Sequence, residues 1–247
     1  MVTISGSVAL VTGAGRGLGR VLTEALLERG AATVYGGARD PGTITAPGVA
    51  PVQLDITDPG QVAAAAMRCG DVTILINNAG IMRRVPLLAA PDTTAARAEM
   101  ETNYFGTLAM CRAFAPVLAA SGGGALVNVL SVVSWLAVPF QGSYAASKSA
   151  AWALTNAIRV ELRHQGTQVT GVYASYIDTD MAAGANLPTI SPQEAATQIL
   201  DGIEAGTEEV LTDLRTRTVK AALPDDLAQL YPPLQQAWDA SPPQTQG

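Results

Sequence analysis

Charged residues are scarce in this sequence, and so are cysteines and long hydrophobic runs. Only 15% of the 247 residues are charged and 48% are hydrophobic, which excludes disorder for most of the chain. Two cysteines, Cys69 and Cys111, cannot form a disulfide framework, and they favour a reducing compartment. No apolar run reaches the roughly 18 residues that span a bilayer, and residues 1–5 carry no basic charge typical of a signal peptide. We therefore expect a cytoplasmic protein without a membrane partner.

Positive charge is the scarcer sign. The chain has 15 Lys and Arg against 21 Asp and Glu, a net charge of −6, which argues against nucleic acid as a partner. Thirteen of the 15 cations are arginines, so Lys148 and Lys220 are the only lysines. His164 is the only histidine, and we predict no catalytic role for it and no metal site.

What the sequence does contain is a regular alternation of short apolar runs and longer helical patterns. The runs are apolar throughout rather than at every second residue, which is typical of strands buried on both faces. An α/β fold with a doubly wound parallel sheet follows, in a single domain of residues 1–223. Strands are expected at 8–12, 32–36, 52–54, 73–76, 125–130, 169–173 and 210–212, and helices at 18–29, 58–68, 95–119, 143–164 and 192–205.

The C-terminal part of the sequence is rich in proline. A short helix is expected to end near Leu223, and residues 224–247 hold five of the 15 prolines. We interpret 224–247 as an extension whose end, residues 241–247, is disordered. Residues 180–188 are small and loop-like, which argues against a large lid over any site nearby.

A glycine-rich turn follows the first expected strand. Glycine allows positive φ and close approach of a pyrophosphate, and the N-terminus of the next helix offers free N–H groups. An ordinary loop is the alternative, which the strand before and the helix after disfavour. The predicted phosphate-binding residues are Gly13, Gly15, Arg16, Gly17, Leu18 and Gly19.

The spacing T-G-x-x-x-G-x-G at residues 12–19 resembles the short-chain dehydrogenase/reductase family, and the likeness extends over residues 6–181. The resemblance implies a Rossmann-type fold and a nicotinamide dinucleotide. It assigns Asp55 and Ile56 to the adenine. It assigns Asn78, Ala79 and Gly80, in the segment N-N-A-G, to the adenosine ribose, while Asn77 is expected to stabilise the sheet.

The residue about 20 positions after the glycine turn distinguishes NAD from NADP in Rossmann folds. That residue is Arg39, and Ala38 stands before it instead of an acid. A guanidinium pairs with a 2′-phosphate, so Arg39 together with Arg16 predicts NADP(H). Two alternatives remain: both arginines are solvated surface charges, or Asp40 turns back to the ribose.

A catalytic group is indicated by Tyr144 and Lys148, which lie four residues apart and so share one helix face. Ser131 precedes Tyr144 by 13 residues, and Asn103 lies in the segment N-Y-F-G; both match the family's pattern. The resemblance implies that Tyr144 is the acid or base, that Ser131 binds the substrate oxygen, and that Lys148 holds the ribose. We expect the Lys148 ammonium, with an oxidised nicotinamide, to lower the pKa of Tyr144. Asn103 is expected to hold a water that connects Lys148 to solvent, or alternatively to cap or kink a helix.

One segment departs from the family's pattern. Ala174 and Ser175 stand where the family has Pro-Gly, while Ile177 and Thr179 match its carboxamide-binding positions. The family's glycine-rich final strand, which many members use to form a tetramer, is also missing. We expect a homo-oligomer, either a homodimer through helices 95–119 and 143–164 or a tetramer.

The substrate pocket is predicted from the residues near Ser131 and Tyr144. The set is mainly apolar and lacks a fixed cation apart from Arg83 and Arg84, so we expect a neutral, fairly hydrophobic ketone or aldehyde, or the corresponding alcohol. The candidates are Ser131, Trp135, Phe140, Tyr176 and Met181, with Trp135 and Phe140 open to a core or dimer role.

Other functions remain possible on the same fold. They are an imine reductase, a biosynthetic ketoreductase or isomerase, and a non-catalytic NADP-binding regulator. The regulator is disfavoured because the chain retains both Tyr144 and Lys148.

Overall fold

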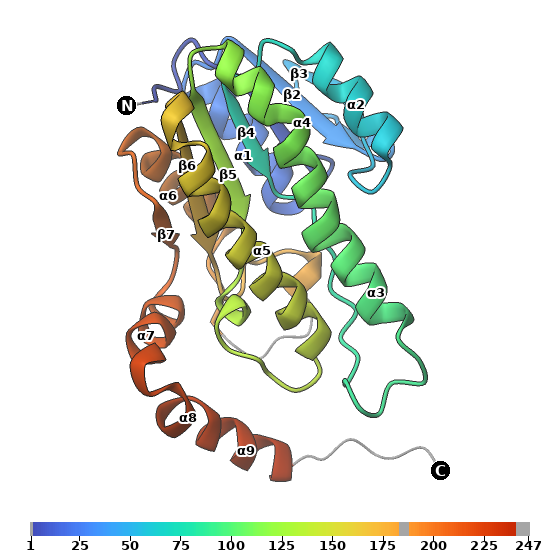
Figure 1. Cartoon of the computed structure of the whole chain (residues 1–247), viewed down its shortest axis with the longest axis vertical. Helices are drawn as coiled ribbons and strands as arrows, with labels where there is room; N and C mark the ends of the chain where they lie inside the picture. Colours follow the sequence, from blue (N-terminus) through green and yellow to red (C-terminus); the bar gives the residue numbers. More distant parts are fainter. Residues whose placement is uncertain (1, 183–187, 241–247) are drawn as a thin grey trace.

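The computed structural model describes residues 2–182 and 188–240, which form one parallel sheet of seven strands between two layers of helices (Figure 1). The strand order is β3-β2-β1-β4-β5-β6-β7, and every neighbouring pair is parallel. The predicted doubly wound α/β fold is therefore confirmed. The strands are β1 (Val8–Thr12), β2 (Thr33–Ala38), β3 (Val49–Gln53), β4 (Ile74–Asn77), β5 (Gly124–Val129), β6 (Thr167–Tyr173) and β7 (Glu209–Leu211).

Each face of the sheet is covered by its own set of helices. Helices α1 (Gly17–Glu28) and α6 (Pro192–Glu204) pack together on one face, where the core includes Val11 and Ile76. Helices α2 (Pro59–Arg68), α4 (Thr107–Ala120) and α5 (Gly142–Glu161) cover the other, where Leu10 and Leu75 are buried. Successive strand residues thus point into different cores, which is why the strands are apolar throughout.

The predicted single helix over 95–119 is interrupted. Helix α3 (Thr94–Met100) passes into a π-helical turn at Glu101–Gly106, which then continues as α4. Asn103 lies in this wide turn, where its side-chain amide donates to the carbonyl of Ile81 and to Ser147 Oγ. A π turn of this kind is frequent at functional sites, and periodicity alone does not distinguish it from an α-helix.

The C-terminal extension is helical as far as residue 240. After β7 the chain forms α7 (Leu214–Ala222), α8 (Asp226–Gln229) and α9 (Tyr231–Ala240), which run below the sheet in Figure 1. Pro232 and Pro233 stand in the first turn of α9, where a missing N–H is tolerated. The predicted disordered end, 241–247, lies outside the described residues.

Short 3₁₀ turns complete the chain at Pro41–Thr43, Val132–Ser134, Arg163–Gln165, Asp180–Ala182 and Leu223–Asp225. The expected loop over 180–188 begins with one of these turns, and 183–187 are not described. Within 2–182 and 188–240, no helix is long and apolar enough to cross a membrane.

Strand order reverses between β1 and β4, and this reversal decides where a ligand binds. The connections from β1 and β4 run to opposite sides of the sheet, which opens a crevice at the carboxyl ends of these strands. The glycine turn after β1 and the N-N-A-G segment after β4 meet there.

Candidate active site

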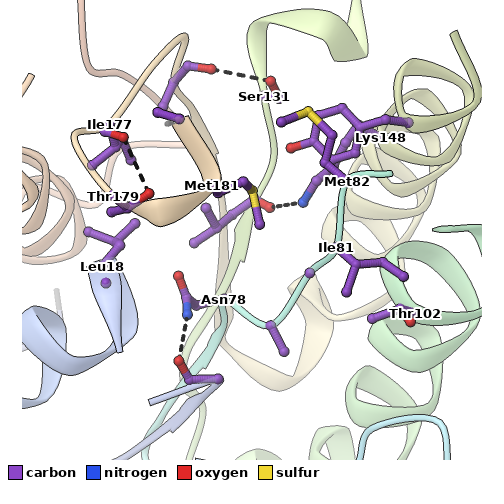
Figure 2. Close-up of a pocket in the computed structure, with 18 of the residues that line it drawn as sticks. Leu18, Asn78, Ile81, Met82, Thr102, Ser131, Lys148, Ile177, Thr179 and Met181 are labelled. Atoms are coloured by element: carbon purple, nitrogen blue, oxygen red, sulfur yellow. Dashed lines mark hydrogen bonds between the residues drawn. The ribbon is translucent and has the colours of Figure 1, made fainter. Parts of the chain in front are cut away.

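A cavity of about 1030 Å³ lies along the carboxyl ends of β1 to β6. That volume is at the upper end of the roughly 300–1,000 Å³ usual for small-molecule sites, so an extended ligand fits. Leu18 and Thr179 enter it from one side in Figure 2, and Ser131 and Lys148 from the other.

Most of the predicted site residues line this one cavity. They are Gly13, Gly15, Arg16, Gly17, Leu18, Gly19, Arg39, Asp55, Ile56, Asn78, Ala79, Gly80, Ser131, Phe140, Tyr144, Lys148, Tyr176, Ile177, Thr179 and Met181. Asn103 and Trp135 do not line it.

The glycine turn is tied to the segment after β4. Asn78 Nδ2 donates to the carbonyl oxygens of Thr12, at 2.9 Å, and Gly13, at 3.3 Å. Thr12 Oγ1 accepts from the backbone N–H groups of both Asn78 and Ala79, each at 3.0 Å. The amide of Asn78 therefore shapes the turn itself, and Thr12 is a positioning residue that the sequence analysis did not assign.

Two carboxylates near the expected adenosine end of the cavity accept hydrogen bonds from neighbouring residues of the chain. Asp40 Oδ1 accepts from the N–H of Gly42 at 2.9 Å, which holds the carboxylate at the following turn. Asp55 Oδ1 accepts from the backbone N–H and the hydroxyl of Thr57, at 2.9 and 2.7 Å. The alternative in which Asp40 turns back to a ribose is thus disfavoured by this turn.

The two arginines expected at the same end differ in their surroundings. Arg16 Nη1 lies 3.1 Å from Asp180 Oδ2, in an exposed ion pair between the glycine turn and the Asp180–Ala182 turn. Arg39 lines the cavity and pairs with none of the described carboxylates. Arg39 is therefore the better candidate for an anionic ligand group.

Tyr144 and Lys148 lie on α5 beside the end of β5. Lys148 Nζ donates to the carbonyl of Val129 at 2.8 Å and lies 5.9 Å from the centre of the Tyr144 ring. Ser131 Oγ donates to the carbonyl of Ala174 at 3.3 Å (Figure 2). The fold thus brings the three predicted groups to one wall of the cavity.

The pKa of Tyr144 differs from the sequence-based expectation. Burial raises it to about 12; the adjacent Ser131 hydroxyl acts in the opposite direction, and the nearby Glu99 and Tyr176 raise it further. Burial also lowers the pKa of Lys148 to about 8. Within the protein itself, removal from water therefore shifts both groups toward their neutral forms, and for Tyr144 this is the direction opposite to the one predicted.

Asn103 connects three segments next to this group. Its Oδ1 accepts from the N–H of Ile81 at 2.9 Å, while Nδ2 donates to the Ile81 carbonyl and to Ser147 Oγ, both at 2.9 Å. These bonds join the π turn to the segment after β4 and to α5. A Cβ on Gly80 would lie 3.1 Å from Asn103 Oδ1, which is a tight contact, and 3.6 Å from Lys148 Nζ, so a side chain there would press on Asn103.

Glu99 is a buried carboxylate that the sequence analysis missed. It is 1% exposed on α3, where Oε2 accepts from Ser143 Oγ at 2.5 Å and Oε1 from the N–H of Arg83 at 2.6 Å. Ser143 directly precedes Tyr144, so Glu99 fixes the helix turn that carries the tyrosine. Nothing in the sequence distinguishes Glu99 from an exposed helix glutamate.

Trp135, a candidate for substrate binding with a core role left open, lies outside the cavity and packs against the core. Its ring stacks on Tyr173 with centroids 4.0 Å apart, and Lys220 Nζ lies 4.7 Å above it. The expectation of a pocket without a fixed cation beyond Arg83 and Arg84 is also wrong, because Arg215 of α7 lines the cavity. The guanidinium of Arg215 lies 5.8 Å from the centre of the Tyr176 ring.

The segment that departs from the family's pattern is well anchored. The N–H of Ser175 donates to Asp213 Oδ2 at 2.8 Å, and the carbonyl of Ala174 accepts from the N–H of Val132 at 2.9 Å. Ile177 forms a bridge with Ile190. The loop that carries Ile177 and Thr179 therefore keeps a defined path without the Pro-Gly pair.

Comparison with known proteins places the chain in the family that its motifs resemble. The family model for short chain dehydrogenases matches residues 7–188. The chain belongs to the short-chain dehydrogenase family. The predicted resemblance is thereby confirmed, and the protein is a member of a family of oxidoreductases that bind a nicotinamide cofactor.

Three similar proteins illustrate the relationship. A short chain dehydrogenase from Burkholderia cenocepacia J2315, crystallised in complex with NADP, superimposes with a TM-score of 0.90 at 46% identity, covering 94% of this chain and 98% of that one. The 3-oxoacyl-[acyl-carrier-protein] reductase FabG of Vibrio harveyi is 33% identical over 83% of this chain and 85% of its own. Dehydrogenase/reductase SDR family member 7B of Bos taurus is 33% identical over 74% of this chain, which spans only 61% of that relative.

The residues of this dehydrogenase fit the cofactor that its family binds. The glycine turn and the start of α1 present backbone N–H groups to the cavity, which suits a pyrophosphate. Gly80 lines the same cavity, where a Cβ would press on Asn103 Oδ1. A glycine turn at a helix N-terminus is expected of a dinucleotide site.

Replacing Lys148 with methionine is expected to stabilise the cofactor-free dehydrogenase while removing its activity. Below pH 8 the folded protein holds a buried ammonium, whose lowered pKa corresponds to a penalty on the order of 3 kcal/mol. Between pH 8 and the ordinary lysine value of 10.5 the unfolded chain binds the extra proton, so wild-type stability rises with pH. Urea unfolding at pH 7 and pH 10.5 measures the difference, which should be largest at pH 7. A variant that is less stable at pH 7 would contradict the buried charge.

Proposed function

We propose that the protein is an NADP(H)-dependent oxidoreductase that transfers a hydride between the nicotinamide and a neutral, fairly hydrophobic ketone or aldehyde. One observation carries the proposal: a single cavity joins the glycine turn, Arg39, and the group of Ser131, Tyr144 and Lys148. The NADP complex of the Burkholderia cenocepacia relative supports the choice of cofactor.

The cofactor is held by residues along the whole cavity. The turn at 13–19 takes the pyrophosphate, Arg39 the 2′-phosphate, and Asp55 with Ile56 the adenine. Asn78, Ala79 and Gly80 lie along the adenosine ribose, Lys148 holds the nicotinamide ribose, and Ile177 with Thr179 the carboxamide. Bound NADPH supplies the hydride.

The protein's own residues manage the proton. With a pKa near 12, Tyr144 is protonated at neutral pH, which is the form that a carbonyl reduction requires. Tyr144 Oη donates its proton to the alkoxide that develops as the carbonyl is reduced. Ser131 Oγ donates a hydrogen bond to the same oxygen and orients the carbonyl. In alcohol oxidation the tyrosinate form of Tyr144 accepts the proton of the alcohol.

The apolar lining of the cavity beside Ser131 and Tyr144 supports a hydrophobic carbonyl substrate. Val138, Phe140 and Met181 give this part of the cavity an apolar surface, although Arg215 adds one cation. The Vibrio harveyi relative is a reductase of 3-oxoacyl groups, which also supports a ketone.

The direct experiment measures NADPH consumption over a panel of aldehydes, ketones, quinones and cyclic imines, each paired with a carboxylate-bearing analogue. We expect turnover of neutral apolar carbonyls. Preference for the anionic analogues would contradict the neutral substrate, and turnover of imines alone would contradict carbonyl reduction.

Replacing Arg39 with alanine tests the cofactor assignment. An exposed guanidinium is screened by solvent, so we expect NADPH binding to weaken by only about tenfold, while NADH binding changes less than twofold. Fluorescence titration of both cofactors measures the two dissociation constants. Arg217→Ala, a change at an exposed arginine outside the cavity, is the control. Equal losses for both cofactors would refute the contact with the 2′-phosphate.

A further inference from the structure

The C-terminal helix α9 forms one wall of the cavity. Leu234, Ala237 and Trp238 all line the cavity with the catalytic group, although they lie far from it in sequence. The Trp238 ring lies 5.1 Å from the ring of Phe140, which belongs to the loop before α5. Two aromatic rings from distant segments therefore meet at the cavity.

Helix α9 is attached to the part of the fold that carries Tyr144. The N–H of Ala137 donates to the hydroxyl of Tyr231 at 3.4 Å. Leu230, Tyr231 and Leu234 pack against the buried cluster that contains Tyr144, Val132 and Val133. The wall is thus held in a fixed relation to the reacting group.

Phe140 adopts a backbone conformation that is unusual for a bulky residue. Its φ is +61°, in the left-handed region, and the residue remains 40% exposed. Such strain persists where the surroundings impose it, and it gathers at ligand sites. Here the strained residue presents its ring to Trp238 and to the cavity.

Two of the polar side chains near this wall lie against Tyr176. Gln141 Nε2 donates to the hydroxyl of Tyr176 at 3.4 Å, and Arg215 lies over the Tyr176 ring. The side chains of Phe140, Leu234 and Trp238 therefore present a mainly apolar surface to a ligand.

We propose that Phe140, Leu234 and Trp238 form an apolar subsite that receives a large apolar substituent, a long alkyl chain or an aryl group, on the carbonyl substrate. The inference rests on the proposed function and adds a specificity to it. Each methylene removed from water favours binding, so the specificity constant should rise with the length of the substituent until the subsite is filled.

The test compares NADPH-dependent reduction of methyl ketones with progressively longer alkyl chains. We expect kcat/KM of the wild type to rise with chain length. Trp238→Ala should lower kcat/KM about 10- to 100-fold for the longest ketone and less than threefold for the shortest. Trp238→Leu, which keeps part of the apolar surface, should restore part of the loss.

The control is Gln235→Ala, an exposed residue of the same helix whose side chain bonds only to Asp239 among the described residues. It should leave the whole series unchanged. Equal losses for short and long ketones, in Trp238→Ala or in Trp238→Leu if the alanine variant does not fold, would overturn the subsite. A wild type that reduces no ketone at all would instead refute the proposed function.

Discussion

Replacing Tyr144 with phenylalanine is expected to lower the rate of carbonyl reduction by about 10²- to 10⁴-fold and to leave the affinity for NADPH nearly unchanged. The ring is buried among Val132, Val133 and Ala145, and phenylalanine keeps those contacts. The hydroxyl alone is lost, and with it the proton donor beside Ser131. Single-turnover reduction and a fluorescence titration with NADPH separate the chemical step from binding.

The matched control is Tyr104→Phe. Tyr104 packs against Phe105 in the π turn and does not line the cavity, so loss of its hydroxyl should leave the rate within twofold. If Tyr144→Phe retained turnover within a factor of a few, another group would have to supply the proton. If it also lost NADPH binding, its role would be structural.

Much of the site could be predicted because a parallel sheet gathers its carboxyl ends at one edge. Gly13 follows β1, Asn78 follows β4 and Ser131 follows β5, so their positions after apolar runs place them together. Tyr144 and Lys148 needed only the helix repeat in addition. These are local patterns, and the topology converts them into neighbours.

Other parts of the site depend on packing that no local pattern reveals. Trp238 belongs to a proline-rich segment that looks like a tail, yet its helix packs beside the loop of Phe140. Trp135 follows the catalytic strand but is drawn into the core by stacking on Tyr173. The raised pKa of Tyr144 reflects how deeply the ring is buried, which spacing does not report.

The glycine turn offers the second large effect, at Gly19. A Cβ there would lie 2.2 Å from the carbonyl oxygen of Gly13 and 2.5 Å from Asn78 Nδ2, closer than real Cβ contacts allow. Asn78 Nδ2 donates to the carbonyl oxygens of Thr12 and Gly13. A side chain at position 19 would therefore push the glycine turn away from the segment after β4. Both segments belong to the predicted dinucleotide site.

Gly19→Ala should therefore weaken NADP(H) binding about 100-fold or more and lower the melting temperature by roughly 2–12 °C, as overpacking of 1–3 kcal/mol implies. Titration with NADPH and thermal unfolding without cofactor measure the two effects. Gly70→Ala is the control, because a Cβ there makes only ordinary contacts, at 3.5 Å from the Met67 carbonyl and beyond, away from the cavity. If Gly19→Ala melted like the wild type and bound NADPH as well, the close approach of the two segments would not be what shapes the turn. A melting temperature that fell while affinity was kept would separate the packing of α1 from the cofactor site.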